Sequence, residues 1–378
     1  MGNSFDYETI VVGAGPSGGF ASKEAARAGK SVLIVEKDLE VGYPEACGGL
    51  VSLKSLREVF SYPEKVIKMI VKSGVAYVKD EGFGFSFERA PLAVLDRALF
   101  DKLIIKDAIK EGADLALGSY AVFKKENEEN IVYIKNKTFT SKYLVNASGS
   151  SYYPKRNGKI LTTQYLFALR DDFYDGIAIY INKQIMPTFF AWYIPYEDGL
   201  AKVGVPLPPS DSLKVAEKVL ELLGLKGKPE KIVSSYVILG GPYKEENGER
   251  FVNIGDAGGQ TKPLTGGGII YGSLGGQYAG KLIGEERLKD YNYEFYERGP
   301  GRDLLKQAKL RPIYESISDD AIYKMMKALK EHGFELIDEE FDVQTKLIKR
   351  VLEDPGLALS LIRILPSFLI DYLKSELS

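Results

Sequence analysis

Residues 7–36 read YETIVVGAGPSGGFASKEAARAGKSVLIVE, and this stretch sets the architecture of the chain. Residues 7–12 form an apolar, β-branched run that predicts a strand, and residues 31–35 predict another. Between them, residues 17–28 have helical spacing, and a glycine-rich turn joins the first strand to this helix. The stretch is therefore predicted to be a strand–helix–strand unit of the kind that binds dinucleotides.

Each glycine of the turn has its own expected role. Gly13 allows the tight turn, Gly15 lets a pyrophosphate approach the backbone, and Gly18 lets the helix pack on the strand. Pro16 and Ser17 open the helix, whose N-terminus favours phosphate charge. We expect all five residues to contact the cofactor.

An acidic residue ends the second strand of this unit. Glu36 stands where a carboxylate can accept hydrogen bonds from both ribose hydroxyls of an adenosine, and it would repel a 2′-phosphate. NADP is therefore disfavoured at this site. Lys37, the next residue, is included among the predicted cofactor contacts. An incidental glycine-rich turn would not explain why strand, helix and acid occur in this order.

A second glycine-rich segment favours FAD over NAD. It follows a predicted strand at 251–254 and leads into a predicted helix at 264–283. Asp256 could accept a hydrogen bond from a ribityl hydroxyl, and the helix N-terminus would face the N1–C2 carbonyl edge of a flavin, which becomes anionic on reduction. The predicted flavin contacts here are Gly255, Asp256, Pro263, Gly266, Gly267, Gly268 and Ile269.

The remaining pattern predicts an α/β protein, α+β overall, with about two domains in its 378 residues. A helix is expected at 96–111, short strands lie between 113 and 146 with hairpin turns at 126–130 and 136–137, and alternating strands fill 161–239 around one helix near 212–223. We predict a Rossmann-type FAD-binding domain (1–60, 91–150 and 245–290) interleaved with an antiparallel-sheet substrate domain (61–90 and 151–244), followed by a helical region (291–378).

Composition excludes several classes of function. A net charge of −2 gives no electrostatic reason to expect nucleic acid. Cys47 and His332 are the only cysteine and histidine, so an internal disulfide and a His/Cys metal cluster are both excluded. No charged and apolar leader precedes the first strand, so a cytoplasmic location is expected. Few His, Cys and Met residues beside many Lys, Glu and Tyr favour a thermophilic source.

The apolar stretch 357–372 raises the question of a membrane. Arg363 and Pro366 interrupt it, and it falls short of the ~20 apolar residues of a spanning helix. It is therefore predicted not to be transmembrane. A buried packing helix and a surface that contacts a membrane or admits a lipid both stay open. His332 precedes Gly333 and is expected to end a helix in a structural role.

Three of these features together resemble the p-hydroxybenzoate-hydroxylase-like FAD superfamily: the turn at 13–18, Asp96-Arg97 with Phe100-Asp101, and Gly255-Asp256. Within it, the chain resembles the geranylgeranyl reductase family of archaeal type, which saturates isoprenoid double bonds of lipid, chlorophyll or tocopherol precursors. The narrower match rests on Cys47-Gly48-Gly49 after Pro44, on 187–195 (PTFFAWYIP, for the family's PxxYxWxFP), on Gly240-Gly241-Pro242, and on 255–269.

The resemblance implies roles for further residues. It makes Cys47 the active-site cysteine, with Gly48 and Gly49 beside the flavin, and it places Arg97 on the FAD. Ala147 and Gly149 join the implied cofactor contacts, and Phe190, Trp192, Ile194, Pro195, Gly240 and Gly241 join the substrate contacts. Plain structural roles stay open: Cys47 as a buried small hydrophobe, Trp192 as core packing and Arg97 as a solvated charge.

One departure concerns the electron donor. Ser148 stands where superfamily members carry an aspartate that helps to organise pyrophosphate and reductant binding. Direct reduction by a nicotinamide is therefore in question, and no second Rossmann fingerprint offers NAD(P)H a domain of its own. NAD(P)H and a ferredoxin-like protein both stay open as donors.

The implied reaction is hydride transfer from reduced FAD to a C=C bond of an isoprenoid or archaeal lipid precursor. A peripheral contact with the membrane is also expected. One rival is a flavin monooxygenase or halogenase, because Phe190-x-Trp192-x-Ile194-Pro195 also resembles the WxWxIP motif of flavin halogenases. Another is a non-catalytic isoprenoid-binding flavoprotein.

Overall fold

The computed structural model describes residues 5–125, 129–154, 158–170, 172–197, 199–333 and 341–364. The chain forms two compact units, each built from three separate segments. The first comprises 1–45, 97–159 and 238–305, and the second comprises 46–96, 160–237 and 306–378. The predicted assignment of an FAD-binding domain and a substrate domain to these segments stays a prediction.

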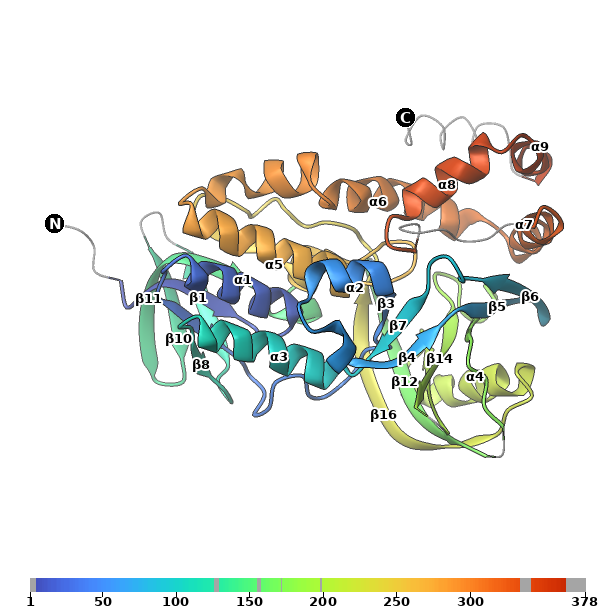
Figure 1. The fold of residues 1–378 in the computed structure, drawn as a ribbon, viewed down its shortest axis with the longest axis horizontal. Coiled ribbons are helices and arrows are strands. Elements are labelled where there is room, and N and C mark those ends of the chain that lie inside the picture. Colours follow the sequence, from blue (N-terminus) through green and yellow to red (C-terminus); the bar gives the residue numbers. More distant parts are fainter. Residues whose placement is uncertain are drawn as a thin grey trace. The chain divides into compact units, whose positions relative to one another are not determined.

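The first unit is built on a seven-stranded sheet (Figure 1). Its strands are β1 (Tyr7–Val12), β2 (Val32–Val35), β8 (Asp114–Ala116), β9 (Ala121–Lys125), β10 (Asn130–Ile134), β11 (Lys137–Asn146) and β17 (Phe251–Asn253). The order is β8-β2-β1-β11-β10-β9, and β17 also pairs with β11. One half of β11 pairs antiparallel with β10, and its other half continues parallel to β1 and β17. The predicted strand–helix–strand unit is confirmed.

Three helices and several short turns complete this unit. They are α1 (Pro16–Arg27), α3 (Arg97–Lys110), α5 (Ile269–Gly284), the 3₁₀ turns Gly149–Ser151, Gly255–Gly258 and Leu288–Asp290, and a π-helical segment, Asn292–Arg298. The helix predicted at 264–283 begins only at Ile269. The reason is local: Gly266 has a φ of +76°, which a helix does not accept, so the residues before it form turns instead.

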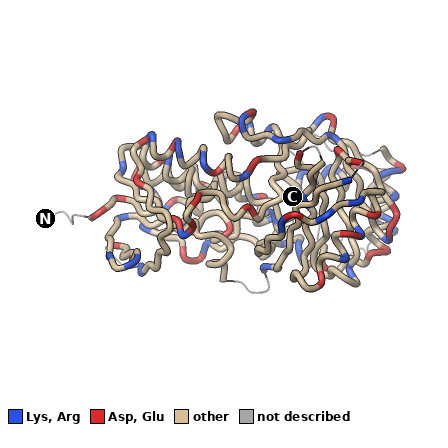
Figure 2. The backbone as a smooth tube through the Cα atoms, turned by 90° about the horizontal axis from the view of Figure 1, so that it is seen from below, with Lys and Arg blue, Asp and Glu red and all other residues tan. Residues whose placement is uncertain are grey.

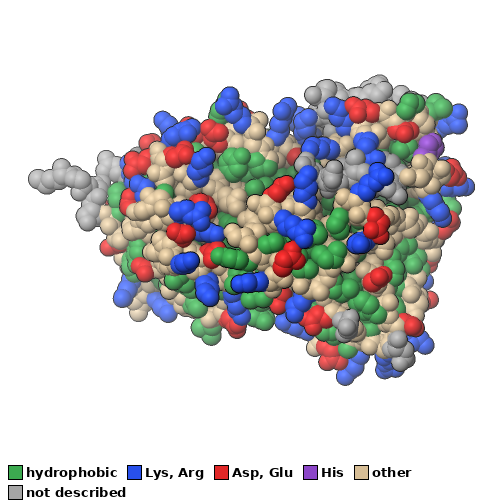
Figure 3. Space-filling view, in the orientation of Figure 1, with side chains coloured by type: hydrophobic (Ala, Val, Ile, Leu, Met, Phe, Trp, Pro, Cys, Tyr) green, Lys and Arg blue, Asp and Glu red, His purple; other side chains and the backbone are tan. Residues whose placement is uncertain are grey.

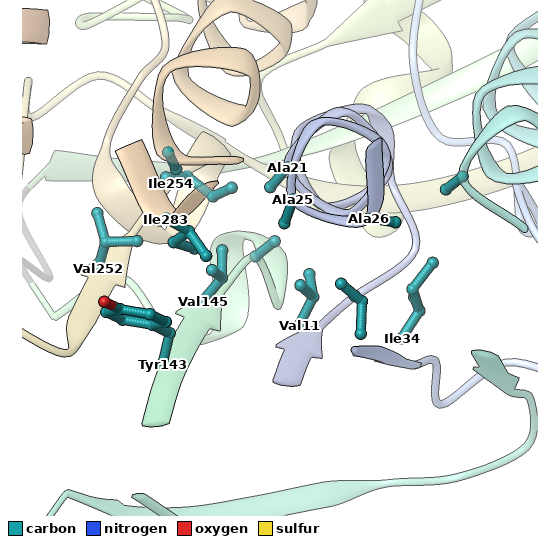
Figure 4. Close-up of a cluster of buried hydrophobic side chains, with 14 of the residues drawn as sticks. Val11, Ala21, Ala25, Ala26, Ile34, Tyr143, Val145, Val252, Ile254 and Ile283 are labelled. Carbon is teal, nitrogen blue, oxygen red and sulfur yellow. The ribbon is translucent and has the colours of Figure 1, made fainter. Parts of the chain in front are cut away.

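Alternation along the parallel strands divides the apolar side chains between the two faces of the sheet. Val11 and Val145 lie on the face of the sheet that α1 covers with Ala21 and Ala25, and Val252 lies beside Ile283 of α5 (Figure 4). The opposite face carries Ile10, Val12, Leu33, Val35, Leu144 and Phe251, which pack with Val132 and Ile134 of β10. A strand that is buried on both faces reads as a continuous apolar run, which is why the last three residues of β1, Ile10-Val11-Val12, are all apolar.

Glycines bring α1 and α5 into backbone contact. Gly272, Gly276, Gly280 and Gly284 recur every four residues and form one stripe of α5. A Cβ at Gly276 would lie 2.2 Å from the Ser17 carbonyl oxygen, and one at Gly280 would lie 2.3 Å from that of Ala21. Neither position has room for a side chain, so the spacing of the two helices depends on these glycines.

The second unit contains a seven-stranded sheet and a three-stranded one. The large sheet has the order β16-β12-β15-β14-β13-β5-β6, and the small one β3-β7-β4. The strands are β3 (Leu50–Ser52), β4 (Ile67–Val71), β5 (Ser73–Val78), β6 (Glu81–Ser86), β7 (Leu92–Leu95), β12 (Lys159–Leu169), β13 (Ile177–Ile181), β14 (Ala191–Glu197), β15 (Leu200–Val205) and β16 (Gly227–Ile238). The substrate sheet was expected to be antiparallel, but β5 and β13 pair in parallel.

Further helices complete the regular elements of the described chain. They are α2 (Leu53–Val59), α4 (Pro209–Leu222), α6 (Gly301–Ser316), α7 (Asp319–Glu331), α8 (Gln344–Glu353), α9 (Pro355–Ile364) and a 3₁₀ turn, Pro63–Lys65. Val215 and Val219 of α4 pack on one face of the large sheet, against Tyr193 and Val203. Trp192 and Ile194 alternate with Tyr193 along β14 and belong to the other face.

The helical tail agrees with the prediction where it is described. His332 caps the C-terminus of α7 and contacts the Ala328 carbonyl oxygen through Nδ1 at 2.8 Å, and Gly333 follows with a φ of +62°. This is the expected structural arrangement. No helix within the described ranges is long and apolar enough to cross a membrane. Residues 365–372 of the apolar C-terminal stretch lie outside those ranges.

Positively and negatively charged residues are interspersed along the backbone (Figure 2). On the face shown in Figure 3, lysine and arginine side chains alternate with acidic and hydrophobic ones. This mixture agrees with the small net charge of −2, and it offers no broad basic stripe on that face of the kind that nucleic-acid backbones need.

The contact between α1 and α5 generates a stability prediction. Gly276→Leu forces a side chain against the α1 backbone, so we expect the free energy of unfolding to fall by about 3 kcal/mol or more. Lys281→Leu is the matched control on the same helix, because that side chain is 71% exposed, and its effect should stay within about 0.5 kcal/mol. Urea unfolding measures both, and equal midpoints for the two variants would contradict the packing described here.

Candidate functional site

The turn after β1 leaves room for a phosphate at one glycine only. A Cβ at Gly13, where φ is +111°, would lie 2.2 Å from the Ala147 carbonyl oxygen, and one at Gly18 would lie 2.0 Å from that of Gly13. Gly15, by contrast, has nothing within 4 Å of its Cβ position. It also caps α1, whose N-terminus receives no side-chain hydrogen bond. Open space beside free backbone N–H groups is the geometry that binds pyrophosphate.

Glu36 is held beside this turn. Its Oε2 accepts a hydrogen bond from the Ala14 backbone N–H at 2.8 Å, and its Oε1 accepts one from that of Asp38 at 3.0 Å. Two backbone donors thus fix the carboxylate between the ends of β1 and β2, where an adenosine ribose is expected. The Lys37 side chain is 57% exposed and pairs with Asp38, so it is anchored at the surface.

The second glycine-rich loop abuts the start of α1. Gly255 has a φ of +60°, and a Cβ there would lie 2.2 Å from Ser17 Oγ. Asp256 Oδ1 accepts a hydrogen bond from Thr261 Oγ1 at 3.1 Å. A Cβ at Gly268, which caps α5 without a side-chain bond, would lie 3.4 Å from the same Oδ1. The N-termini of α1 and α5 and the carboxylates of Glu36 and Asp256 therefore lie at the two glycine-rich turns.

Three charged residues at or near the second glycine-rich loop, Asp256, Arg97 and Asp101, have largely buried side chains. Burial raises the pKa of Asp256, and the hydrogen bond from Thr261 and the charge of Arg97 oppose that rise. Arg97 donates to Asp101 at 2.9 Å, and their side chains are only 12% and 8% exposed. The alternative that Arg97 is a solvated surface charge is therefore wrong.

Ser148 belongs to a network of polar side chains at the ends of β11 and β17. Its Oγ donates to Asn146 Oδ1 at 2.6 Å, and Asn146 Nδ2 donates to Asn253 Oδ1 at 2.7 Å. The network joins the ends of β11 and β17. Gly149 next to it has a φ of +80° and open space at its Cβ position.

The remaining predicted residues of the first unit pack around these loops. Ala147 is 8% exposed and lies against Gly18, and Pro263 and Ile269 are also buried. Gly240 and Gly241 were predicted as substrate contacts. They lie against Tyr153, which donates to the Gly241 carbonyl oxygen at 2.7 Å, and a Cβ at Gly259 would lie 2.1 Å from that oxygen.

In the second unit, the segment around Cys47 lies against the aromatic strand. A Cβ at Gly48 would lie 2.7 Å from Ile194 Cδ1 and 3.5 Å from Trp192 Nε1. Cys47 itself is a half-buried free thiol, and the Gly49 backbone N–H donates to its Sγ at 3.4 Å. Two motifs that are far apart in the sequence therefore meet on one face of the sheet.

The Trp192 indole fits because the facing residue has no side chain. Trp192 pairs with Gly204 across β14 and β15, and a Cβ there would lie 1.9 Å from indole Cζ2. Phe190 stacks on Phe189 with ring centroids 4.2 Å apart. Pro195 alternates to the opposite face of β14, away from Trp192 and Ile194.

Three further residues that were not predicted lie beside Cys47 and Trp192. Gln164 and Lys202 approach the Cys47 carbonyl oxygen, each at 3.4 Å, and Gly204 accommodates the indole. A glycine inside a predicted strand is a known sign of close approach and could have marked Gly204. Gln164 and Lys202 belong to no motif, and only the strand register brings them here.

Metal ligands do not gather in the described parts of the chain. No group of three or more His, Cys, Asp and Glu side chains there could hold an ion. The residues instead fit FAD, because open space at Gly15, the uncapped start of α1 and the fixed Glu36 carboxylate match a pyrophosphate and a ribose.

The chain is similar to curated archaeal proteins along nearly its whole length, although no protein-family model matches it. Digeranylgeranylglycerophospholipid reductase 2 of Methanopyrus kandleri is 26% identical over 91% of this chain and 96% of its own. Digeranylgeranylglycerophospholipid reductase of Methanocella arvoryzae is 27% identical over 95% and 99%. The resemblance to archaeal geranylgeranyl reductases is thereby confirmed.

Solved structures agree on the fold. A geranylgeranyl bacteriochlorophyll reductase-like protein of Thermoplasma acidophilum superposes with a TM-score of 0.79 at 24% identity, covering 95% of this chain and 99% of that one. A variant of the flavin-dependent brominase Bmp2 reaches 0.64 at 16% identity, with 98% of each chain covered. The predicted α/β flavoprotein fold class is confirmed, and at these identities the likeness concerns the fold alone.

The Glu36 geometry generates a binding prediction. Glu36→Gln removes the charge that would accept from the ribose hydroxyls, so we expect FAD affinity to fall about tenfold or more. Glu40→Gln is the control, because that side chain is 59% exposed on a nearby loop. Titration of the apoprotein, followed by quenching of FAD fluorescence, measures both. Unchanged affinity in Glu36→Gln would remove this carboxylate from the site.

The indole contact generates a spectroscopic prediction. Gly204→Ala cannot keep the present indole position, and Trp192 is the only tryptophan, so its emission maximum should shift. Gly84→Ala is the control in the same sheet, because its Cβ would have its nearest neighbour at 3.9 Å. Fluorescence spectra with iodide quenching compare the two, and identical spectra would count against the contact.

Proposed function

We propose that this protein is an FAD-dependent reductase that saturates C=C bonds of geranylgeranyl chains on archaeal membrane lipid precursors. One observation carries the proposal: Cys47-Gly48-Gly49 and Trp192-x-Ile194, two motifs of the reductases, pack together in the second unit. Relatives named as reductases of such lipids, similar along almost the full chain, support the same substrate class.

The residues of the first unit would hold the cofactor. Gly15 and the start of α1 would receive the pyrophosphate, Glu36 the adenosine ribose, and Asp256 with Arg97 the ribityl side. When bound and reduced, FAD would supply the hydride. The glycines after Asp256 let backbone approach a planar ring, and α5 would direct its N-terminus at developing negative charge.

The residues of the second unit would handle the lipid. Trp192 and Ile194 offer apolar surface to an isoprenoid chain, which has no polar group to recognise along its length. Since an unpolarised alkene is a poor hydride acceptor, most of the rate must come from positioning. Cys47 is the candidate for holding the alkene in place or for delivering the proton.

The electron donor is proposed to be a ferredoxin-like protein. The serine at 148 bonds to Asn146 and leaves no carboxylate at that position, and the sequence has no second dinucleotide fingerprint. NAD(P)H is the alternative. Stopped-flow reduction distinguishes them: fast bleaching of the flavin by reduced ferredoxin and slow bleaching by NADPH or NADH are expected, and the reverse order would favour a nicotinamide.

The protein is expected to work in the cytoplasm and to reach its substrate at the membrane surface. A phospholipid carrying geranylgeranyl chains resides in a bilayer, so the enzyme must contact that surface to bind it. Sedimentation with vesicles that contain the lipid should carry the protein down, while the protein alone should stay in the supernatant. Equal recovery in both supernatants would contradict membrane contact.

The activity is tested anaerobically. Reduced protein is incubated with geranylgeranyl diphosphate or a digeranylgeranylglycerol phospholipid, and mass spectrometry counts the hydrogen gained for each saturated bond. Saturation of either substrate is the expected result. No gain with either would refute the proposal, and a C4a-oxygen adduct spectrum after exposure to air would favour the monooxygenase or halogenase rival. Bound lipid without turnover would indicate a carrier.

Cys47→Ala tests the role of the thiol. We expect turnover of the lipid to fall about 100-fold while FAD stays bound, because a positioned proton donor contributes on that scale. Cys47→Ser is the companion variant, since a hydroxyl keeps a weaker donor, and it should retain more activity than Cys47→Ala. Wild-type rates in both variants would leave Cys47 with a packing role only.

A further inference from the structure

A buried cation lies beside the Cys47 segment. Lys202 of β15 is only 4% exposed, although lysines are rarely buried. Its Nζ lies 3.4 Å from the Cys47 carbonyl oxygen and 3.9 Å from the centroid of the Tyr196 ring. Removing an ammonium group from water is costly unless other groups compensate. The carbonyl and the ring are compensating partners, so they tie the lysine to this place.

A second donor reaches the same carbonyl from the neighbouring strand. Gln164 of β12 donates through Nε2 to the Cys47 oxygen at 3.4 Å. The β12–β15 register pairs Gln164 with Gly204 and Leu166 with Lys202, so both polar side chains belong to one face of the sheet. It is the face that carries Trp192 and Ile194.

Gln164 also keeps an unused acceptor. Its side-chain Oε1 is buried and has no hydrogen-bond partner among the described residues, and the residue is 7% exposed. A Cβ at Gly48 would lie 3.9 Å from this oxygen, so the acceptor faces the Cys47 segment. Buried acceptors without partners are uncommon and are usually explained by a bound water or ligand. The place is therefore more than a packing contact.

We propose that Lys202 and Gln164 are positioning residues that together hold the Cys47 carbonyl oxygen and so fix the backbone beneath the thiol. We call this pair of donors on the Cys47 carbonyl oxygen the clamp. The role of the thiol rests on the proposed function, but the clamp itself does not. Glycines follow Cys47 at both next positions, and Gly49 has a φ of +78°, so this backbone is free to take many conformations. Two donors on one oxygen fix the orientation of the peptide plane between Cys47 and Gly48.

The clamp is tested first without any turnover. Hydrogen–deuterium exchange of the 45–50 segment is compared in wild type, Lys202→Met and Gln164→Met, and we expect exchange about fivefold faster in each variant. Lys228→Met is the control on β16 of the same sheet, at an exposed position. Because Cys47 is the only cysteine, alkylation by iodoacetamide reads the same segment. It should be faster in Gln164→Met, which changes no charge.

Activity then separates positioning from plain packing. If geranylgeranyl lipid is reduced, Lys202→Met should lower kcat about tenfold at an unchanged KM, and Lys202→Arg, which keeps a cationic donor, should restore most of it. Wild-type exchange in both variants overturns the clamp. Faster exchange with no turnover in wild type supports the clamp and refutes the proposed function. If Lys202→Met does not fold, Gln164→Met alone decides.

Discussion

Backbone contact between two helices is the constraint on which the candidate cofactor site depends. α1 and α5 approach so closely that a methyl group at Gly276 would lie 2.2 Å from a carbonyl oxygen of α1. That approach brings the loop before α5 onto the start of α1, where Gly255 meets Ser17. The two glycine-rich turns therefore adjoin each other. Their joining places one uncapped helix N-terminus beside the other, which suits a ligand with a charged and a polar end.

Glycines make space for a neighbouring group in both units. In the first unit, Gly15 leaves open space at the start of α1, and backbone N–H groups hold the Glu36 carboxylate beside it, an arrangement that would suit a charged ligand. In the second unit, a glycine makes room for a ring instead: Gly204 accepts the Trp192 indole. An apolar face with a few buried polar groups would suit a long hydrocarbon, because shape positions the chain and the polar groups act only at the bond that reacts.

Much of the fold followed from local patterns, and much of the site did not. The strand–helix–strand unit was predictable because β1 ends in the apolar run Ile10-Val11-Val12 and the turn after it requires glycine at fixed positions. The start of α5 was misplaced since helical composition extends into residues that glycine holds in turns. For Arg97, the sequence did not decide between a solvated surface charge and a contact with FAD, because burial depends on neighbours that are distant in sequence. Lys202 and Gln164 were missed for a similar reason: only strand register places them beside Cys47.

The discontinuity of the units has a consequence for synthesis on the ribosome. The turn at 13–18 is synthesised well before α5, which packs against the helix after that turn and follows it only after two segments of the second unit. Until α5 has been made, the face of α1 that it covers stays exposed. Contacts between such distant segments form late and slowly. The nascent chain therefore depends on protection from aggregation for longer than its size alone would suggest.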